Sequence, residues 1–157
     1  YVIPEGGTNL PAVAGVKEMV SSFRTHFDIL TLPVGTGGTI VGCIQALKGE
    51  SSILGFSALK GDFLVDDIRS LHNRLGLPAY SNWSVVNDYH FGGYGKTTAE
   101  LLNFIQNFEA SQKIPLDQVY TGKMIFGLFK MIEEGRFEKG SVIMAIHTGG
   151  LQGVSSM

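Results

Sequence analysis

Apolar runs alternate with amphipathic stretches over most of the chain, and this alternation constrains the fold more than any other feature. Each run has the length of a buried strand, and apolar residues recur at helical spacing between the runs. The predicted strands are residues 27–34, 51–59, 80–86 and 141–147, and the predicted helices are residues 39–47, 62–75, 97–108 and 122–134. Such alternation implies parallel strands with helices on both faces. The sequence therefore predicts a single α/β domain over residues 1–157, doubly wound around a mainly parallel sheet.

Charge and cysteine content exclude several classes of function. The 12 basic and 14 acidic residues give a net charge of −2 without a block of one sign, so neither nucleic acid nor a membrane is an expected partner. Cys43 is the one cysteine, so no intramolecular disulfide or cysteine zinc cluster can form. The histidines have no metal-like spacing with carboxylates, and no metal is predicted. A reducing cytoplasm fits this composition best.

In a parallel sheet, ligands bind outside the carboxyl ends of the strands, and one such loop is rich in glycine. The glycine loop, residues 35–39, reads Gly35-Thr36-Gly37-Gly38-Thr39 and joins a predicted strand to a predicted helix. Unpaired amides and the positive end of the helix dipole meet at a helix start, and glycines let an anion touch the backbone. We therefore predict a phosphate site at this loop; a tight turn without a ligand is the alternative.

The glycine loop does not match the motifs of larger nucleotides. Dinucleotide binding would require glycine at position 40, which is Ile40, and an acidic residue about 20 positions later, where residues 57–59 offer none. A nucleoside triphosphate loop would require lysine where Thr39 stands. A single terminal phosphate group is the guest that remains.

Five short motifs occur in order, each at a predicted strand end. They are IPEGGTN (3–9), GTGGT (35–39), FGGYG (91–95), VYTGK (119–123) and HTGG (147–150). Together they resemble the second half of the 1-aminocyclopropane-1-carboxylate (ACC) deaminase and D-cysteine desulfhydrase family. Members of that family are pyridoxal 5′-phosphate (PLP) enzymes with a fold of the tryptophan synthase β type. The resemblance covers nearly the whole chain and implies PLP as the cofactor.

The resemblance also implies roles for individual residues. It gives the 5′-phosphate of PLP to the glycine loop and places Thr121 opposite the pyridine nitrogen. Tyr94 and Tyr120 match tyrosines that flank cofactor and substrate, as candidates for proton transfer or nucleophilic roles. Either phenol would need a pKa lowered from about 10 to act as a base near neutrality. Asn9 and Thr148 would border the substrate.

Two threonines bear on the substrate, a small amino acid. Where ACC deaminases carry glutamate after the active-site tyrosine and leucine after the histidine of the last motif, this sequence has Thr121 and Thr148. Both resemble the D-cysteine desulfhydrase side of the family. The expected reaction is α,β-elimination, which gives pyruvate, ammonia and sulfide; deamination of ACC to 2-oxobutanoate and ammonia is the alternative.

One family feature has no counterpart in the sequence. The resemblance implies a Schiff-base lysine in the first half of the family's chain, and no motif here matches it. The opening YVIPEGG reads as the end of a buried strand, so we expect the C-terminal portion of a longer enzyme that is inactive unless another segment supplies the amine. A non-catalytic phosphate- or PLP-binding module stays open. Family members are similar homodimers, which implies a homo-oligomer.

Overall fold

Four parallel strands form the centre of the molecule. The computed structural model describes residues 5–151 and orders the strands β3-β2-β1-β4. Their bounds are β1 Ile29–Val34, β2 Ser52–Ser57, β3 Trp83–Val86 and β4 Ile143–Ala145. Thr31 on β1 pairs with Leu54 on one side and with Ala145 on the other, so β1 is a central strand. The predicted α/β fold with a parallel sheet is confirmed.

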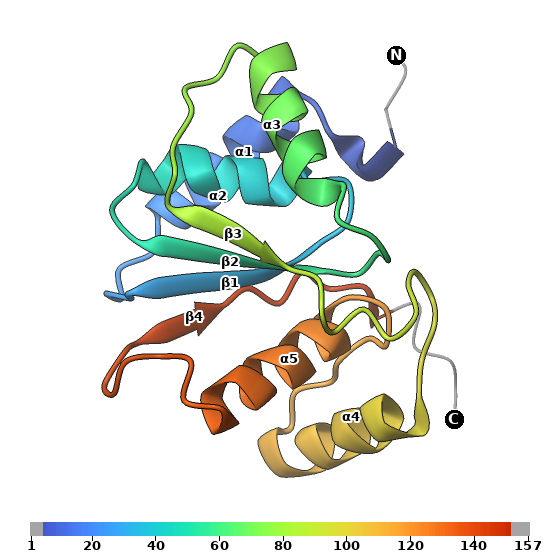
Figure 1. Cartoon of the computed structure of the whole chain (residues 1–157). Coiled ribbons are helices and arrows are strands. Elements are labelled where there is room, and N and C mark those ends of the chain that lie inside the picture. The colour runs from blue at the N-terminus through green and yellow to red at the C-terminus, as the bar shows by residue number, and fades with distance from the viewer. Residues whose placement is uncertain (1–4, 152–157) are drawn as a thin grey trace.

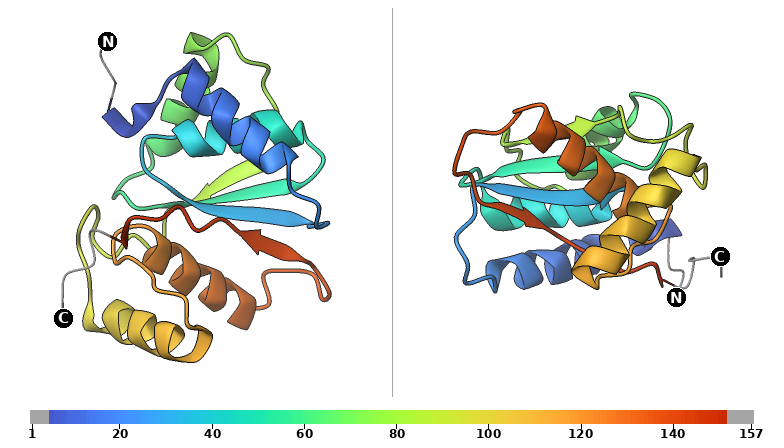
Figure 2. Two further views of the ribbon diagram at one scale, coloured as in Figure 1. Left: turned by 180° about the vertical axis from the view of Figure 1, so that it is seen from behind. Right: turned by 90° about the horizontal axis from the view of Figure 1, so that it is seen from below.

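Helices cover both faces of this sheet. Helices α1 (Leu10–Ser21), α2 (Gly38–Leu47) and α3 (Leu64–Arg74) lie on one face, and α4 (Ala99–Gln112) and α5 (Thr121–Glu133) lie on the other (Figure 1). The view from behind shows the same two layers, and the view from below shows α5 crossing under the strands (Figure 2). The winding is therefore double, as the alternation of strands and helices predicts.

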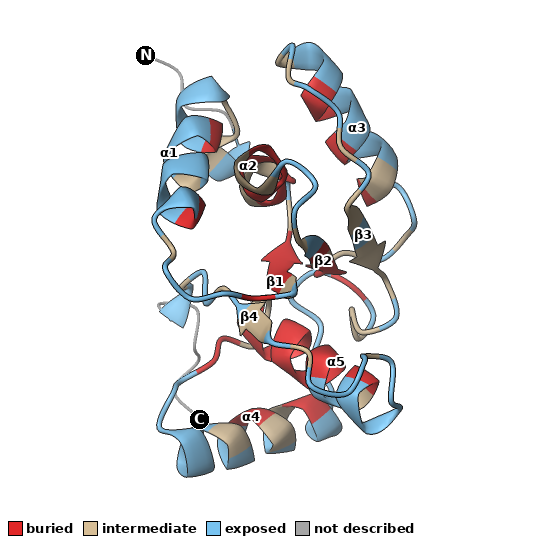
Figure 3. Ribbon diagram, turned by 90° about the vertical axis from the view of Figure 1, so that its left-hand side faces the viewer, coloured by how far each residue is buried: buried red, intermediate tan, exposed pale blue. Residues whose placement is uncertain are grey.

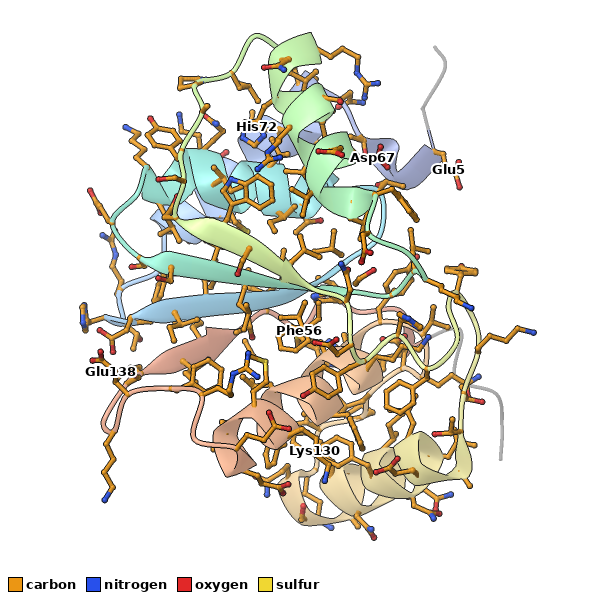
Figure 4. All side chains as sticks on the ribbon, in the orientation of Figure 1. Glu5, Phe56, Asp67, His72, Lys130 and Glu138 are labelled. Atoms are coloured by element: carbon orange, nitrogen blue, oxygen red, sulfur yellow. The ribbon has the colours of Figure 1, made fainter. Side chains whose placement is uncertain are left out.

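Each face of the sheet has its own hydrophobic core. One core packs β1 against α2 and α3 through side chains such as Leu32, Ile44 and Ile68. The other packs α4 and α5 under the sheet and includes Phe56, which points from β2 toward α5 (Figure 4). Figure 3 shows buried residues all around α2, whereas α1 is exposed on its outer side. Helix α2 is thus an inner helix, and its start is held rigidly by the core.

The first helix, α1, is not among the elements that the apolar pattern predicts. It is specified by its ends rather than by a broad apolar face: Asn9 caps it by accepting a hydrogen bond from the amide of Ala12 at 2.9 Å, and Pro11 stands in its first turn. Val13 and Val20 are its buried residues. Its close neighbour is α2, because a Cβ at Gly42 would lie 2.5 Å from the Cβ of Val16.

The ends of several elements differ from the predicted ones. The strand predicted over 141–147 is limited to Ile143–Ala145, and α4 begins one residue after Thr98, whose hydroxyl accepts from the amide of Leu101. At the end of the opening YVIPEGG, Glu5–Gly7 form a 3-10 turn, η1, and the strand end predicted before it stays a prediction. Its first residues, 1–4, lie outside the described range.

Candidate functional site

A cavity of about 540 Å³ opens at the carboxyl ends of β1 and β4. Its lining comes from residues 33–40 at the end of β1, from Tyr120 at the start of α5, from residues 148–150 after β4, and from Gly6. These segments are far apart in the sequence, and the parallel order of the strands brings them to one edge. This is the edge at which open α/β sheets bind ligands.

The floor of the cavity is the main chain of the glycine loop. All five predicted residues, 35–39, line it. Helix α2 begins at Gly38, and the amide of Val41 donates to the carbonyl of Gly37 at 3.1 Å. Within residues 5–151, the amides of 36–40 have no main-chain acceptor, and the helix dipole adds positive potential there. The floor is therefore a seat for an anion.

Two glycines of the floor occupy places where a side chain would be crowded. A Cβ at Gly35 would lie 3.2 Å from the ring of Tyr120, and one at Gly38 would lie 3.0 Å from the hydroxyl of Thr8. Gly37 has φ of +85°, a left-handed conformation that only glycine adopts without strain. A cradle of bare backbone fits a phosphate group, whose oxygens need close approach to several amides.

Threonine hydroxyls extend the floor on one side. The hydroxyls of Thr8 and Thr36 lie 2.9 Å apart and link the segment before α1 to the glycine loop. Asn9, predicted to border the substrate, does not line the cavity, and its side-chain oxygen accepts from Ala12 to cap α1. The structure therefore gives Asn9 a structural contact, and its role toward a substrate stays a prediction.

Tyr94 and Tyr120 lie side by side at the rim of the cavity. Their ring centroids are 6.0 Å apart with planes inclined by 68°. Tyr120 lines the cavity, whereas Tyr94 is 63% exposed and reaches it through this ring contact. Burial, followed by the neighbouring Tyr94 and by Asp117, raises the pKa of Tyr120. A raised pKa keeps the phenol protonated at neutral pH, so Tyr120 is suited to donate a proton and not to act as a base.

Asp117 organises the start of α5 and was not predicted as part of the site. Its carboxylate is buried and accepts from the amides of Val119 (2.8 Å), Tyr120 (2.6 Å) and Thr121 (2.8 Å), and from the hydroxyl of Thr121 (2.5 Å). One side chain thus satisfies three amides at the positive end of a helix. An aspartate four residues before a threonine is the sequence signal for this arrangement.

Thr121 is held away from the cavity in this arrangement. Its side chain is fully buried, it donates to Asp117, and it accepts from the amide of Asp117 at 3.0 Å. It is not among the residues that line the cavity. The hydroxyl proton is therefore committed to a carboxylate, and only a lone pair is left for another partner. Its predicted place opposite a pyridine nitrogen stays a prediction.

Residues 148–150 form the wall opposite the glycine loop, and His147 holds them. Nε2 of His147 lies 2.8 Å from the carbonyl of Pro115, and Nδ1 accepts from the amide of Gly149 at 3.1 Å. Since Nδ1 accepts, Nε2 carries the proton and donates to Pro115. Both ring nitrogens are paired within the protein, which favours a structural role for His147 over general acid catalysis. Thr148, predicted to contact substrate, lines the cavity.

Other reactive groups lie away from this cavity. Cys43 is buried in α2, and burial raises the pKa of its thiol to about 12, so it is no nucleophile at neutral pH. No cluster of three or more metal-binding side chains occurs among residues 5–151. A second cavity of about 660 Å³ lies between α3 and β3 and is lined in part by His72, which Figure 4 shows on α3, and by Trp83. It is not at the carboxyl edge of the sheet.

None of the helices within the described range has the length and apolar character that a bilayer span requires.

Fold and site together define a class of protein: a doubly wound α/β protein with unpaired amides at a helix start that are suited to an anion, beside a tyrosine side chain. The chain belongs to the pyridoxal-phosphate dependent enzyme family, whose model matches residues 7–149.

Named relatives fall within one branch of that family. The chain is 31% identical to a putative ACC deaminase of Pyrococcus furiosus over 98% of its length, and covers 50% of that protein. It is 32% identical to the bifunctional, mitochondrial D-cysteine desulfhydrase/ACC deaminase of Arabidopsis thaliana, covering 98% of this chain and 42% of that protein. A D-cysteine desulfhydrase of Serratia proteamaculans is 27% identical, with 96% of this chain and 50% of that protein covered.

A solved structure gives the same result. The crystal structure of an ACC deaminase homologue superposes with a TM-score of 0.81 and 32% identity, and covers 98% of this chain and 50% of that one. The resemblance to the ACC deaminase and D-cysteine desulfhydrase family is thereby confirmed. The chain spans about half the length of the relatives it matches.

Proposed function

We propose that the chain binds PLP in the cavity at the carboxyl edge of the sheet, with the 5′-phosphate on the amides of the glycine loop. The observation that carries this proposal is the start of α2, where the amides of 36–40 have no main-chain acceptor and the residues that carry them line an open cavity. When bound, PLP supplies an electron sink for bonds at the α-carbon of an amino acid. Family membership supports the choice of this cofactor over other phosphate compounds.

The side chains around the floor would act on the rest of the ligand. Tyr120, protonated at neutral pH because its pKa is raised, would donate a proton or hydrogen bond to the reacting molecule. Thr148 would contact the substrate from the opposite wall, where His147 fixes its loop. Tyr94 would close the open side by its contact with Tyr120. The side-chain oxygen of Asn9 and the hydroxyl proton of Thr121 are engaged with the protein, so Asn9 would act on a ligand through its side-chain NH2 group and Thr121 through its remaining lone pair.

We propose D-cysteine, or a similar β-substituted D-amino acid, as the substrate of the intact enzyme. Removal of the α-proton and expulsion of sulfide from the β-carbon, followed by hydrolysis, convert D-cysteine to pyruvate, ammonia and sulfide. Thr121 and Thr148 support this choice over ACC, because ACC deaminases of the family carry glutamate and leucine at the matching positions. ACC deamination to 2-oxobutanoate and ammonia is the second candidate, and it is favoured by the names of several relatives.

Exchange of the two threonines tests this choice. In the complete enzyme, Thr121→Glu together with Thr148→Leu should lower kcat/KM for D-cysteine and raise it for ACC, measured as pyruvate and 2-oxobutanoate release. Ser111→Leu, an exposed change on α4, is the matched control and should alter neither rate. Unchanged preference in the double variant would remove the support that these positions give to D-cysteine.

A non-catalytic PLP-binding module is the candidate from another class. It is favoured by the lining of the cavity, which contains no lysine among the described residues. Incubation with PLP followed by borohydride reduction distinguishes the two functions. A pyridoxyl-lysine adduct, located by mass spectrometry, supports the enzyme; saturable binding that leaves no adduct supports the module. Absence of any PLP or phosphate effect on Tm would refute both.

We further propose that the protein works in a reducing cytoplasm as a homo-oligomer, with neither nucleic acid nor membrane as a partner. The single buried cysteine supports a reducing compartment. The net charge of −2 supports the absence of nucleic acid and membrane partners. The free edge that β3 presents within the described sheet supports association. Light scattering at high concentration tests the oligomer, and a sharp monomeric mass would contradict it.

A further inference from the structure

The loop that carries Tyr94 contains a strained turn, in which Phe91 packs against Phe126 of α5 with ring centroids 5.0 Å apart. In this tyrosine loop, residues 90–95, three successive residues are left-handed: Phe91 at φ 55°, Gly92 at 98° and Gly93 at 118°. A left-handed phenylalanine is unfavourable by about 1–2 kcal/mol. Within the loop, the amide of Gly92 donates to Nδ1 of His90 at 2.9 Å, and the amide of Gly93 donates to the His90 carbonyl at 3.1 Å. A strained turn of this kind needs contacts from outside to fix it.

Lys123 supplies those contacts from α5. Its Nζ donates to the carbonyl of His90 at 2.9 Å and to the carbonyl of Gly93 at 2.8 Å. The side chain is 1% exposed, which is rare for lysine. One ammonium group therefore joins both ends of the left-handed segment to the helix that begins beside the cavity.

The burial of Lys123 has a cost that the surrounding structure offsets. Burial lowers the pKa of the lysine, while the carboxylate of Asp117 acts in the opposite direction. An ammonium group buried without partners would be strongly unfavourable, whereas one bonded to two carbonyls beside a carboxylate is not. The lysine is thus placed to hold a loop, at a position where an apolar residue would be the simpler choice.

The side chain that this arrangement presents is Tyr94, the neighbour of Gly93. Tyr94 is 63% exposed and makes its ring contact with Tyr120, so its own packing does little to fix it. The hydrogen bond from Lys123 to the carbonyl of Gly93 fixes the residue directly before Tyr94. Tyr120 stands at the N-cap of α5, three residues before Lys123, so a single turn of the helix bears both the clamp and the partner ring.

The geometry points to Lys123 as a positioning residue, which fixes Tyr94 against Tyr120 at the rim of the cavity by binding the carbonyls of His90 and Gly93. What this tyrosine pair does to a substrate rests on the proposed function, but the placement itself does not. Lys123 is not among the residues that line the cavity, and its ammonium is bonded to the carbonyls of His90 and Gly93. It is therefore not the amine that would carry the cofactor.

The titration of Tyr120, followed by NMR of protein labelled with 13Cζ-tyrosine and without any ligand, tests the inference. Tyr94 is among the causes of the raised pKa of Tyr120. Tyr94→Phe should lower that pKa toward about 10. Lys123→Met should lower it in the same direction, and the double variant should fall no further than Tyr94→Phe alone. Because burial lowers the pKa of Lys123, its amine loses its charge in the alkaline range in which Tyr120 titrates, so loss of a positive charge does not explain a fall in the Tyr120 pKa.

Lys17→Met is the matched control, because Lys17 is exposed on α1, which lies on the face of the sheet opposite to α5 (Figure 1). It should leave the titration of Tyr120 unchanged. A Tyr120 pKa in Lys123→Met that equals or exceeds that of the unmodified protein would overturn the inference. Such a failure leaves the phosphate seat untouched, since the glycine loop is tested by phosphate binding alone.

If Lys123→Met does not fold, NMR of the unmodified protein still tests the two hydrogen bonds of Lys123. The ammonium of Lys123 should give a slowly exchanging 15Nζ signal with couplings through the hydrogen bonds to the carbonyl carbons of His90 and Gly93. Rapid exchange without those couplings would contradict the clamp.

Discussion

The floor and the rim of the cavity are built in different ways. The floor consists of main chain, namely the glycines and amides at the start of α2. This helix is buried in the hydrophobic core that includes Leu32, Ile44 and Ile68. The rim is side chain: Tyr94, Tyr120 and Thr148 stand on loops that are tied by Asp117, Lys123 and His147. A ligand group common to a whole family suits a rigid main-chain seat, whereas side chains on tied loops can be exchanged to suit different substrates.

The difference also separates two ways of losing function. A side chain added to a glycine of the floor would be crowded, and its effect would fall on the anion seat together with a modest loss of stability. Loss of Asp117 or Lys123 at the rim would leave buried polar groups without partners, and its effect would spread to the fold because both residues are buried.

Asp117→Ala should have the largest effect. It removes the acceptor for three main-chain amides and the Thr121 hydroxyl, and it leaves Lys123 buried without a counter-charge. We expect a loss of about 3–5 kcal/mol in the free energy of unfolding. Urea denaturation at pH 7 measures this loss.

Asp66→Ala is the control for Asp117→Ala. Asp66 forms an exposed ion pair with Arg69 at 3.4 Å on α3, and its removal should change stability by less than about 0.5 kcal/mol. Equal effects of the two variants would show that the rim does not depend on a buried network.

Gly37→Ala should have an intermediate effect and should act on the floor. Its φ of +85° is unfavourable for alanine, and the new Cβ would lie 3.2 Å from Ile68. We expect a loss of about 1–2 kcal/mol in stability together with weaker phosphate binding. Thermal unfolding with and without phosphate measures both.

Gly15→Ala, the same replacement at another place, should change stability in the opposite direction. Gly15 lies in α1 with ordinary helical backbone and no atom within 4 Å of a new Cβ. Stability should rise by about 0.5–1 kcal/mol with phosphate binding unchanged. A destabilised Gly15→Ala or a neutral Gly37→Ala would break the distinction drawn for the floor.

The pH dependence of stability should show the smallest effect, and it concerns the rim. The raised pKa of Tyr120 means that the folded state keeps its proton where the unfolded state loses it, above about pH 10. The stability that this proton contributes is complete below pH 10 and is lost as the pH rises through the folded pKa. Tyr120→Phe should therefore reduce the fall in stability between pH 9 and pH 11. An identical fall in both proteins would contradict the burial of this phenol.

The floor could be predicted from the sequence because its determinants are local. A strand end, a run of glycines and a helix start follow one another within residues 33–40, and the rules for helix termini need nothing else. The sheet was predictable for a similar reason, since apolar runs of strand length are separated by helical spacing. Helix α1 was not predicted, because its sequence signal is the cap at Asn9 with Pro11 in the first turn and not an apolar stripe.

The rim could not be predicted in the same way because its contacts join distant parts of the chain. Lys123 is 33 positions from His90 and 30 positions from Gly93, and only the folded chain brings these donors and acceptors together. Resemblance to a family pointed to Tyr94, Tyr120 and Thr121, but not to the residues that hold them. A role of Tyr120 as a base would require a lowered pKa, and only the folded environment, which raises that pKa, decides whether this condition is met.

The most direct test of the phosphate seat is a titration of 15N-labelled protein with inorganic phosphate. The amide signals of residues 36–40 should shift together and saturate, while that of Gly15 stays in place. Shifts that are absent from 36–40, or that spread evenly over the chain without saturation, would contradict the claim that these amides bind the phosphate of the ligand.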